Sequence, residues 1–557
     1  MTAGLLYVTM QPKPGLPSSQ FHDWYNNEHG PLRLRLPFFP NGYRYRAIDS
    51  EPNSPFDASK HEWLALYDIT DSAEFLRPPY TTMREDTVKT EREKETMAQI
   101  TVGRRMFDLI KEWKADDYKP VEDIDHDSKG YVLVPVCFKV KPGTEGKIDK
   151  WYDEEHVSLL QKVPGWRRSR RFVTSSVLNP SAEEKEYLAI HEYANSAGQN
   201  SPEMKAAVST EMSKDIYANV VIGRVRRVYE WYYTFGPAPR DLQSLSDPTY
   251  TAKFSSRDGL TQTTASSSTN RAVVESYITT PDGVQIPYKL EGSGDPEAPL
   301  IVLVNSILTD WGIWDEFLDA FFADPKNQKF RVVRYRARGR LADPGDTPIT
   351  VDLLSQDVIT ILDALRVRKA AAVIGVSLGG ATTLNAALKY PSRVENFISS
   401  DTNSLAPPSN PTAWQERITL SETDPESPTD TMGARVVGEK LAEITTRRWF
   451  VPDSYDGGVK QARAEKVKQY VYTNHLGGFK KCVKALYSYD LREAMKTGTV
   501  RGLFVVGAGD GVLPKGMQKM AEDYAVAGTE LAIIEGAGHL PMAEQPEKFA
   551  KVVGDFL

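Results

Sequence analysis

The feature that most constrains the fold is a GVSLG pentapeptide, Gly375 to Gly379, between a strand signal and a helix signal. Residues 370–376 form a short apolar run, and residues 381–390 have helical composition. The two glycines permit a sharp turn that lifts Ser377 above the end of the strand. A chance GxSxG in a loop lacks this strand–turn–helix context. The pentapeptide therefore predicts an α/β domain with a nucleophilic serine at the edge of its sheet.

The rest of the C-terminal half has the same alternation. Apolar strand signals occur at 300–307, 330–335, 397–403, 501–507 and 530–534, and residues 351–365 have helical spacing. Strands that alternate with helices in this way predict a mostly parallel sheet with helices on both faces.

A serine nucleophile needs a base, and the base needs an orienting carboxylate. The C-terminal part contains two histidines, His475 within a helical stretch and His539 directly after a strand. Asp510 ends another strand between Ser377 and His539. The predicted triad is therefore Ser377, Asp510 and His539, in the chain order Ser, Asp, His. The alternatives are a surface histidine for His539 and a turn-forming aspartate for Asp510.

An oxyanion hole needs two backbone N–H groups aimed at one point. We expect one from Leu378, the residue after the nucleophile, and the other from Ile307 in the loop after strand 300–304. The triad and this pair need no metal or organic cofactor, and the sequence contains no CxxC, HExxH or glycine-rich phosphate loop.

The loop NSILTDWGIWDEF, residues 305–317, resembles the corresponding loop of 3-oxoadipate enol-lactonases, which are α/β hydrolases. Segments 414–418 and 448–450 resemble the helical cap of that family, which we place at about 405–495. The resemblance covers about residues 275–557. It implies a serine hydrolase that opens a small enol-lactone ring without metal or organic cofactor, with the triad named above.

Candidate substrate-binding residues lie in this loop, in the arginine-rich segment 335–340 and in the cap. Arginines there would attract a carboxylate, although a structural arginine cluster is the alternative. The candidates are Asn305, Ser306, Trp311, Arg336, Arg338, Trp414 and Trp449.

The N-terminal half contains an internal repeat, WYNNEH at 24–29 and WYDEEH at 151–156. Each copy has a strand signal before it and three after it, with a charged helical segment before the last, which gives the order β-α-β-β-α-β twice. This order is that of a ferredoxin-like fold. Since one such sheet leaves a naked face, two copies are expected to close into an intramolecular α+β barrel.

The repeat resembles the dimeric α+β barrel superfamily, and its WYxxEH signature resembles EthD-like domains. The resemblance covers about residues 1–235, with repeats at 1–120 and 121–238. It implies a cleft between helices and sheet, and some members of the superfamily cyclise, dehydrate or oxidise aromatic or polyketide-like molecules.

Each repeat places a tyrosine and a histidine four residues apart on one helix face, Tyr25 with His29 and Tyr152 with His156. These pairs are candidates for acid–base work at a second site. The alternative is that the signature packs the fold around a buried hydrogen bond.

Residues 239–272 are rich in serine and threonine and show little periodicity. Such a segment buries too little apolar area to offset its ordering entropy, so we expect a linker there. The α/β hydrolase domain then spans 273–557.

Composition excludes several classes of protein. The 557 residues are 40% hydrophobic and 26% charged with a net charge of −7, which is typical of globular chains and gives no support for a nucleic-acid partner. No apolar run is long enough to span a membrane. Two cysteines and a strand-like N-terminus without a basic leader predict a reducing, cytoplasmic location.

Three hypotheses remain open. The first is a serine hydrolase of a small lactone or ester. The second keeps the fold but assigns it carbon–carbon bond hydrolysis, lyase or cyclase chemistry on an aromatic or polyketide-like metabolite, with the barrel taking part. The third makes the barrel a non-catalytic binding and assembly module. In each the expected partner is a small molecule, and the oligomeric state stays open.

Overall fold

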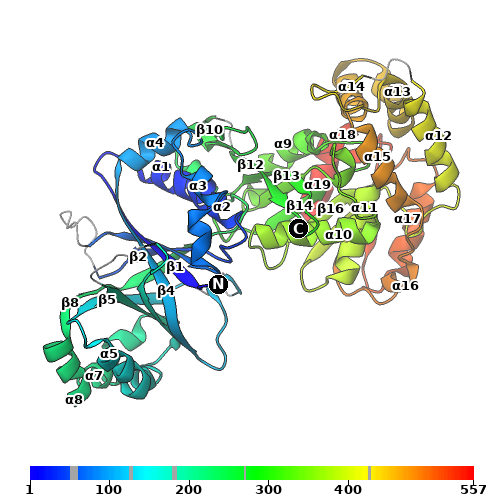
Figure 1. Ribbon diagram of the computed structural model, residues 1–557. Coiled ribbons are helices and arrows are strands. Elements are labelled where there is room, and N and C mark those ends of the chain that lie inside the picture. The colour runs from blue at the N-terminus through cyan, green and yellow to red at the C-terminus, as the bar shows by residue number, and fades with distance from the viewer. Residues whose placement is uncertain (50–59, 124–128, 179–184, 269–270, 425–427) are drawn as a thin grey trace. The chain divides into compact units, whose positions relative to one another are not determined.

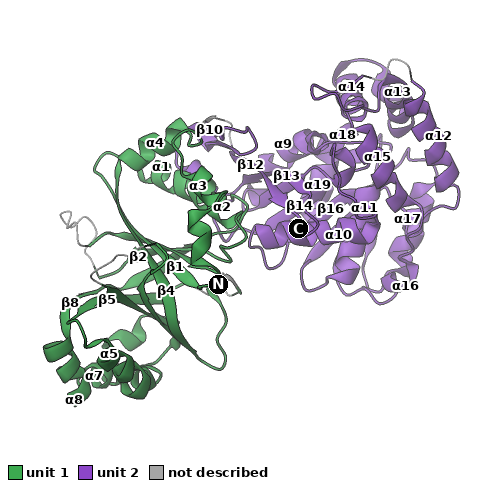
Figure 2. Ribbon diagram, viewed as in Figure 1, with its two compact units in different colours: residues 1–239 green, residues 240–557 purple. Residues whose placement is uncertain are grey.

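The computed structural model describes residues 1–49, 60–123, 129–178, 185–268, 271–424 and 428–557 (Figure 1). The chain divides into two units, Met1–Pro239 and Arg240–Leu557 (Figure 2). Within the described residues, no helix is both long and apolar enough to cross a membrane.

The first unit is an antiparallel barrel of eight strands within the described residues. Its strands follow the order β7-β6-β4-β1-β3-β2-β9-β5, and pairing of β5 with β7 closes the ring, while β8 continues the line of β9 along β5. The strands are β1 (Gly4–Pro12), β2 (Tyr43–Ala47), β3 (Trp63–Ile69), β4 (Ile100–Lys114), β5 (Val132–Val140), β6 (Trp166–Thr174), β7 (Glu186–Tyr193), β8 (Val221–Arg226) and β9 (Tyr229–Thr234).

Helices flank this barrel on two sides, with α1 to α4 on one side and α5, α7 and α8 on the other (Figure 1). They are α1 (Ser18–Asp23), α2 (Gly30–Leu34), α3 (Tyr80–Met83), α4 (Glu91–Ala98), α5 (Glu145–Trp151), α6 (Val157–Leu160), α7 (Pro202–Val208) and α8 (Glu211–Asp215). The two WYxxEH segments form π-helical turns, Trp24–His29 and Tyr152–His156.

Strands β1, β3, β5 and β7 of the barrel bury both of their faces. In β1, Leu5 and Tyr7 belong to the core inside the ring, whereas Leu6 and Val8 pack under the helices. Successive side chains of a strand point to opposite faces, so a strand covered on both sides reads as a continuous apolar run. This explains the unbroken apolar segments that the sequence contains here.

The second unit is built on a ten-stranded sheet in the order β10-β11-β12-β13-β15-β14-β16-β17-β18-β19. The strands from β15 through β19 run parallel, and β10 to β13 extend one edge in antiparallel fashion. They are β10 (Lys253–Ser255), β11 (Gln262–Thr264), β12 (Ala272–Thr279), β13 (Gln285–Gly292), β14 (Leu300–Val304), β15 (Arg331–Tyr335), β16 (Ala372–Val376), β17 (Asn396–Ser400), β18 (Arg501–Gly507) and β19 (Glu530–Ile534).

Helices cover both faces of this sheet, since α10 packs with α11 and α9 packs with α19. The sheet-covering helices are α9 (Asp315–Ala323), α10 (Val351–Ala364), α11 (Leu378–Lys389), α17 (Leu513–Asp523), α18 (Pro541–Glu544) and α19 (Pro546–Phe556). Between β17 and β18 the chain forms the predicted cap from α12 (Asn410–Glu422), α13 (Glu439–Trp449), α14 (Gly458–Tyr472), α15 (Leu476–Cys482) and α16 (Arg492–Met495).

We expected a linker at 239–272, but the structure shows short strands and buried side chains there. Residues 269–270 lie outside the described residues. Strands β10 and β11 add to the sheet, and the side chains of Leu242, Tyr250 and Phe254 are buried. The hydroxyl groups of Thr261 and Ser276 share a hydrogen bond of 2.7 Å. Single buried apolar residues and a hydroxyl–hydroxyl bond hold this segment in place. Because these residues do not recur at a regular spacing, the sequence shows no strand pattern here.

Candidate active site

Ser377 occupies a strained turn between β16 and α11. Its backbone has φ of 58° and ψ of −120°, a conformation that costs energy for a residue with a side chain. The glycines on either side make the turn possible, because a Cβ on Gly379 would lie 2.3 Å from the carbonyl oxygen of Val304. A Cβ on Gly375 would lie 2.2 Å from the carbonyl oxygen of Gly379. Ser377 is partly exposed although both of its neighbours are buried.

His539 and Asp510 form a direct pair. Nδ1 of His539 lies 2.7 Å from Oδ2 of Asp510 in a hydrogen bond. The backbone N–H of His539 donates to the carbonyl of Trp449 at 2.7 Å, and the two rings stack with centroids 5.7 Å apart. The histidine is therefore held at its backbone, along its ring face and at Nδ1.

The same edge of the sheet carries all three predicted triad residues. Strands β16, β17, β18 and β19 are parallel neighbours, so their carboxyl ends meet at one edge. Ser377 follows β16, Asp510 follows β18 and His539 follows β19. Crevices at this edge are where open α/β sheets bind ligands.

The carboxylate of Glu544 fixes the turn that carries His539. It accepts hydrogen bonds from the N–H of Gly538, from the N–H of Val451 at 2.9 Å and from Oγ of Ser454 at 2.7 Å. Burial raises the pKa of Glu544. Sequence reasoning missed this residue, because nothing local links it to a cap segment ninety positions earlier.

A second buried carboxyl group, Asp401, lies beside Asp510. It follows β17 with φ of 46°, and it accepts from the N–H of Gly507 at 2.9 Å and from Oγ of Ser400 at 2.6 Å. Burial, and then the charge of Asp510, hold the pKa of Asp401 well above its usual value. Asp401 directly follows β17, and this position at the end of a strand is the sequence feature that could have identified it.

Asp401, Asp510 and His539 offer possible metal-ligand atoms within 4.8 Å of one another. Both oxygens of Asp401 already accept hydrogen bonds, and Nδ1 of His539 is bonded to Asp510. We therefore interpret the group as a hydrogen-bonded network that positions His539.

The predicted oxyanion residues lie together. Ile307 and Leu378 are buried and line one small cavity of about 20 Å³. Asn305 shapes this loop: its Nδ2 donates to the carbonyl of Tyr335 at 2.9 Å, and its Oδ1 accepts from Nε1 of Trp314 at 2.8 Å. These two hydrogen bonds show that the Asn305 amide holds the loop in place, and its role in substrate binding stays a prediction.

Ser306 stays a candidate. Its Oγ is buried without a hydrogen-bond partner among the described residues, and it lines the same cavity as Ile307 and Leu378.

The arginine-rich segment forms ion pairs with carboxylates of the fold. The guanidinium of Arg338 is 1% exposed and pairs with Asp357 and Asp282, each at 2.7 Å. Arg336 pairs with Asp310 at 3.1 Å and stacks on Trp311, 4.4 Å from its ring centroid. These pairs favour the structural interpretation most clearly for Arg338, whose guanidinium is buried between two carboxylates. Arg336 is 40% exposed and Trp311 is half-buried, so both stay candidates for substrate binding.

Comparison with known proteins agrees with this geometry. Residues 301–552 match the model of the alpha/beta hydrolase family. The C-terminal unit is an alpha/beta hydrolase domain. The family match and the lactonase relatives make the protein a hydrolase enzyme.

Individual relatives match about half of this chain or less. 3-oxoadipate enol-lactonase 2 of Acinetobacter baylyi is 27% identical over 261 residues, which cover 47% of this chain and 89% of the relative. Zearalenone hydrolase of Bionectria ochroleuca is 35% identical over 128 residues, 22% of this chain and 45% of the relative. The crystal structure of a hydrolase from Pseudomonas aeruginosa PA01 is 29% identical with a TM-score of 0.43, covering 51% of this chain and 97% of that structure.

The cap of the hydrolase unit carries two arginines that sequence reasoning missed. The guanidinium carbon of Arg417 lies 4.4 Å from the ring centroid of Trp414, and that of Arg448 lies 6.0 Å from it. Desolvation, and then the charge of Arg417, lower the pKa of Arg448 to about 10, while the charge of Asp510 acts in the opposite direction. No carboxylate of the described residues forms an ion pair with either arginine.

Trp414 and Trp449, the predicted cap residues, are both buried. Trp414 supports the two arginines, and Trp449 stacks against His539. Trp414 therefore lies beside Arg417 and Arg448, and Trp449 lies beside His539, so both stay candidates for substrate binding.

In the first unit, the two Tyr–His pairs are internal. Tyr25 and His29 have ring centroids 5.0 Å apart, and Nδ1 of His29 lies 2.9 Å from Oε1 of Glu93. Tyr152 and His156 have centroids 5.2 Å apart, and Nδ1 of His156 bonds to the carbonyl of Ala207 at 3.0 Å. Desolvation lowers the pKa of both histidines to about 4. This geometry favours the packing interpretation of the signature.

Proposed function

We propose that the protein hydrolyses a small lactone or ester through an acyl-enzyme on Ser377. The observation that carries the proposal is the 2.7 Å His539–Asp510 pair at the sheet edge where the strained Ser377 lies. Similarity to 3-oxoadipate enol-lactonase 2 supports the choice of a lactone or ester.

The proposed reaction uses only side chains and water. His539 takes the proton of the Ser377 hydroxyl as Oγ attacks the carbonyl carbon. The N–H groups of Leu378 and Ile307 stabilise the developing oxyanion. The intermediate collapses, the ring or ester C–O bond breaks, and His539 returns the proton to the leaving oxygen. Water then attacks the acyl-enzyme with His539 as base, releasing the acid and regenerating the serine.

Asp510 stabilises the imidazolium that forms in each half of this cycle. Burial raises the pKa of Asp401, which favours its protonated form, and in that form it would donate a hydrogen bond to Asp510.

The substrate we propose carries a carboxylate. Arg417 is half-buried and Arg448 is exposed, both pack near the ring of Trp414, and neither has a carboxylate partner among the described residues. Guanidinium groups bind carboxylates through planar, charge-assisted hydrogen bonds.

The test is fluorophosphonate labelling with p-nitrophenyl acetate turnover in parallel, on wild type, Ser377→Ala and Ser392→Ala. Ser392 is exposed and matches the chemical change away from the site. We expect one adduct by intact mass, lost in Ser377→Ala together with turnover by roughly 10³-fold or more, and retained in Ser392→Ala. Labelling that persists in Ser377→Ala contradicts the proposal.

For the first unit, we propose a duplicated ferredoxin-like domain of the EthD-like kind that acts as a binding module. Its strand orders support the duplication, since β4-β1-β3-β2 in the first half corresponds to β8-β5-β7-β6 in the second. The WYxxEH turns occupy the same place in both halves, and their buried histidines favour binding or assembly over acid–base catalysis.

A further inference from the structure

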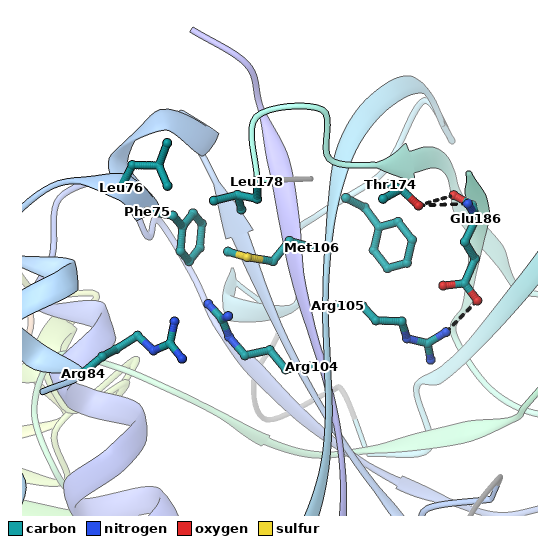
Figure 3. Close-up of a pocket in the computed structure, with 10 residues that line it drawn as sticks. Phe75, Leu76, Arg84, Arg104, Arg105, Met106, Thr174, Leu178 and Glu186 are labelled. Atoms are coloured by element: carbon teal, nitrogen blue, oxygen red, sulfur yellow. Dashed lines mark hydrogen bonds and ion pairs between the residues drawn. The ribbon is translucent and has the colours of Figure 1, made fainter. Parts of the chain in front are cut away.

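A cavity of about 350 Å³ opens in the first unit beside β4. Phe75, Met106 and Leu178 give it an apolar wall, and Arg84 and Arg104 project into it (Figure 3). The volume lies within the range of small-molecule sites, which combine apolar walls with a few polar groups. Every residue named belongs to the first unit, so the cavity shares no residue with the hydrolase site.

The two arginines point toward each other (Figure 3). Nη2 of Arg104 donates to the hydroxyl oxygen of Tyr80 at 2.7 Å, and its guanidinium lies over Phe75 at 5.9 Å from the ring centroid. No carboxylate of the described residues forms an ion pair with Arg84 or Arg104. Desolvation, and also the charge of Arg84, lower the pKa of Arg104. Two like charges in a partly desolvated cavity destabilise each other unless an anion lies between them.

The remaining charges of the cavity compensate each other. Arg105 pairs with Glu186 at 2.9 Å on the opposite wall (Figure 3). The excess positive charge is therefore confined to Arg84 and Arg104, next to the apolar wall.

We propose that this cavity binds a small organic acid, with its carboxylate between Arg84 and Arg104 and its apolar body against Phe75, Met106 and Leu178. The guanidinium groups supply the charge-assisted hydrogen bonds that a carboxylate accepts. The apolar wall selects acids with an aromatic or aliphatic body over inorganic anions. The proposal does not depend on the chemistry assigned to Ser377.

The first measurement is binding of 4-fluorobenzoate and 6-fluorohexanoate to the full-length protein by ¹⁹F NMR. We expect saturable binding with a dissociation constant of about 1 mM or tighter for at least one of them. The neutral 4-fluorobenzamide should bind roughly tenfold more weakly or worse, and the affinity of the acid should fall with added salt.

The variants locate the site. Arg84→Gln and Arg104→Gln should each weaken acid binding roughly tenfold or more. Leu178→Trp should block it without changing charge. Arg77→Gln is the matched control, because Arg77 is exposed on the same segment and, among the described residues, forms an ion pair with Glu74 alone.

Chemical protection provides a second readout that does not rely on folding of a variant. Phenylglyoxal modifies exposed guanidinium groups, and the bound acid should protect Arg84 and Arg104 but not Arg77, as measured by peptide mass spectrometry. Arg448→Gln tests the hydrolase site as the alternative location. Binding lost in Arg448→Gln but retained in Arg104→Gln, or no protection of Arg84 and Arg104 by either acid at about ten millimolar, overturns the proposal.

Discussion

The buried carboxyl group of Asp401 should make the hydrolase unit less stable as the pH rises above about 4. Burial, and then the charge of Asp510, raise its pKa well above the usual value of 3.8. The folded protein therefore holds a proton that the unfolded chain releases above about pH 4. Stability from this group is complete below pH 3.8 and is lost as the pH rises toward the folded pKa.

The perturbation is Asp401→Asn, which keeps the size of the side chain and cannot ionise. The wild type should lose roughly 1.4 kcal/mol per pH unit through Asp401 above about pH 4, and the variant should not. At roughly 2.1 cal/mol/K per residue over a unit of about 320 residues, this slope corresponds to about 2 °C per pH unit in unfolding midpoint.

The assay is the thermal midpoint of the hydrolase unit in the full-length protein, measured for both proteins from pH 4 to pH 6. The midpoint of Asp401→Asn minus that of wild type should increase by about 2 °C for each pH unit. A constant offset from altered hydrogen bonding to Ser400 does not affect this slope. A difference that stays flat or falls as the pH rises refutes the reasoning.

Three further predictions concern other elements. Gly379→Ala should abolish turnover and destabilise the protein by about 1–3 kcal/mol or more, because the added Cβ would clash with backbone oxygens. Ester turnover measures the first effect, and urea unfolding measures the second. Arg338→Met should cost about 3–5 kcal/mol by leaving Asp357 buried without a partner, and an unchanged unfolding midpoint would contradict the structural role. His156, whose pKa is lowered from 6.5 to about 4, contributes stability above pH 6.5 that is lost as the pH falls toward 4. His156→Gln should remove about 3 kcal/mol of this acid sensitivity, visible as a flatter dependence of the unfolding midpoint between pH 6.5 and 4.

Local chemistry made part of the hydrolase unit predictable. A strand, a GxSxG turn and a helix predict their own geometry, because the strained turn at Ser377 tolerates only glycine at its crowded neighbours. His539 and Asp510 were found as polar residues at strand ends, and the structure joins them by a hydrogen bond. Parallel strands bring such ends to one edge whatever the intervening sequence.

Three candidate binding residues make contacts that the sequence does not reveal. Asn305, Arg336 and Arg338 are polar groups whose partners lie 9 to 56 positions away along the chain. The expectation of a linker at 239–272 differs from the structure for a similar reason. Strand β11 pairs with β12, and β10 pairs with β11. Composition records the polarity of these groups and segments, but not the partners that satisfy them.

The sequence by itself determined the repeat of the first half, the α/β alternation of the second and the triad candidates, because each is a pattern of neighbours along the chain. Only the tertiary structure decided which charges are satisfied. It paired Arg336 and Arg338 with carboxylates, gave Arg417 and Arg448 no carboxylate partner among the described residues, and directed Arg84 and Arg104 into a cavity. The physical reason is that the energy of a charge depends on its desolvation and its distance to other charges, and folding sets both.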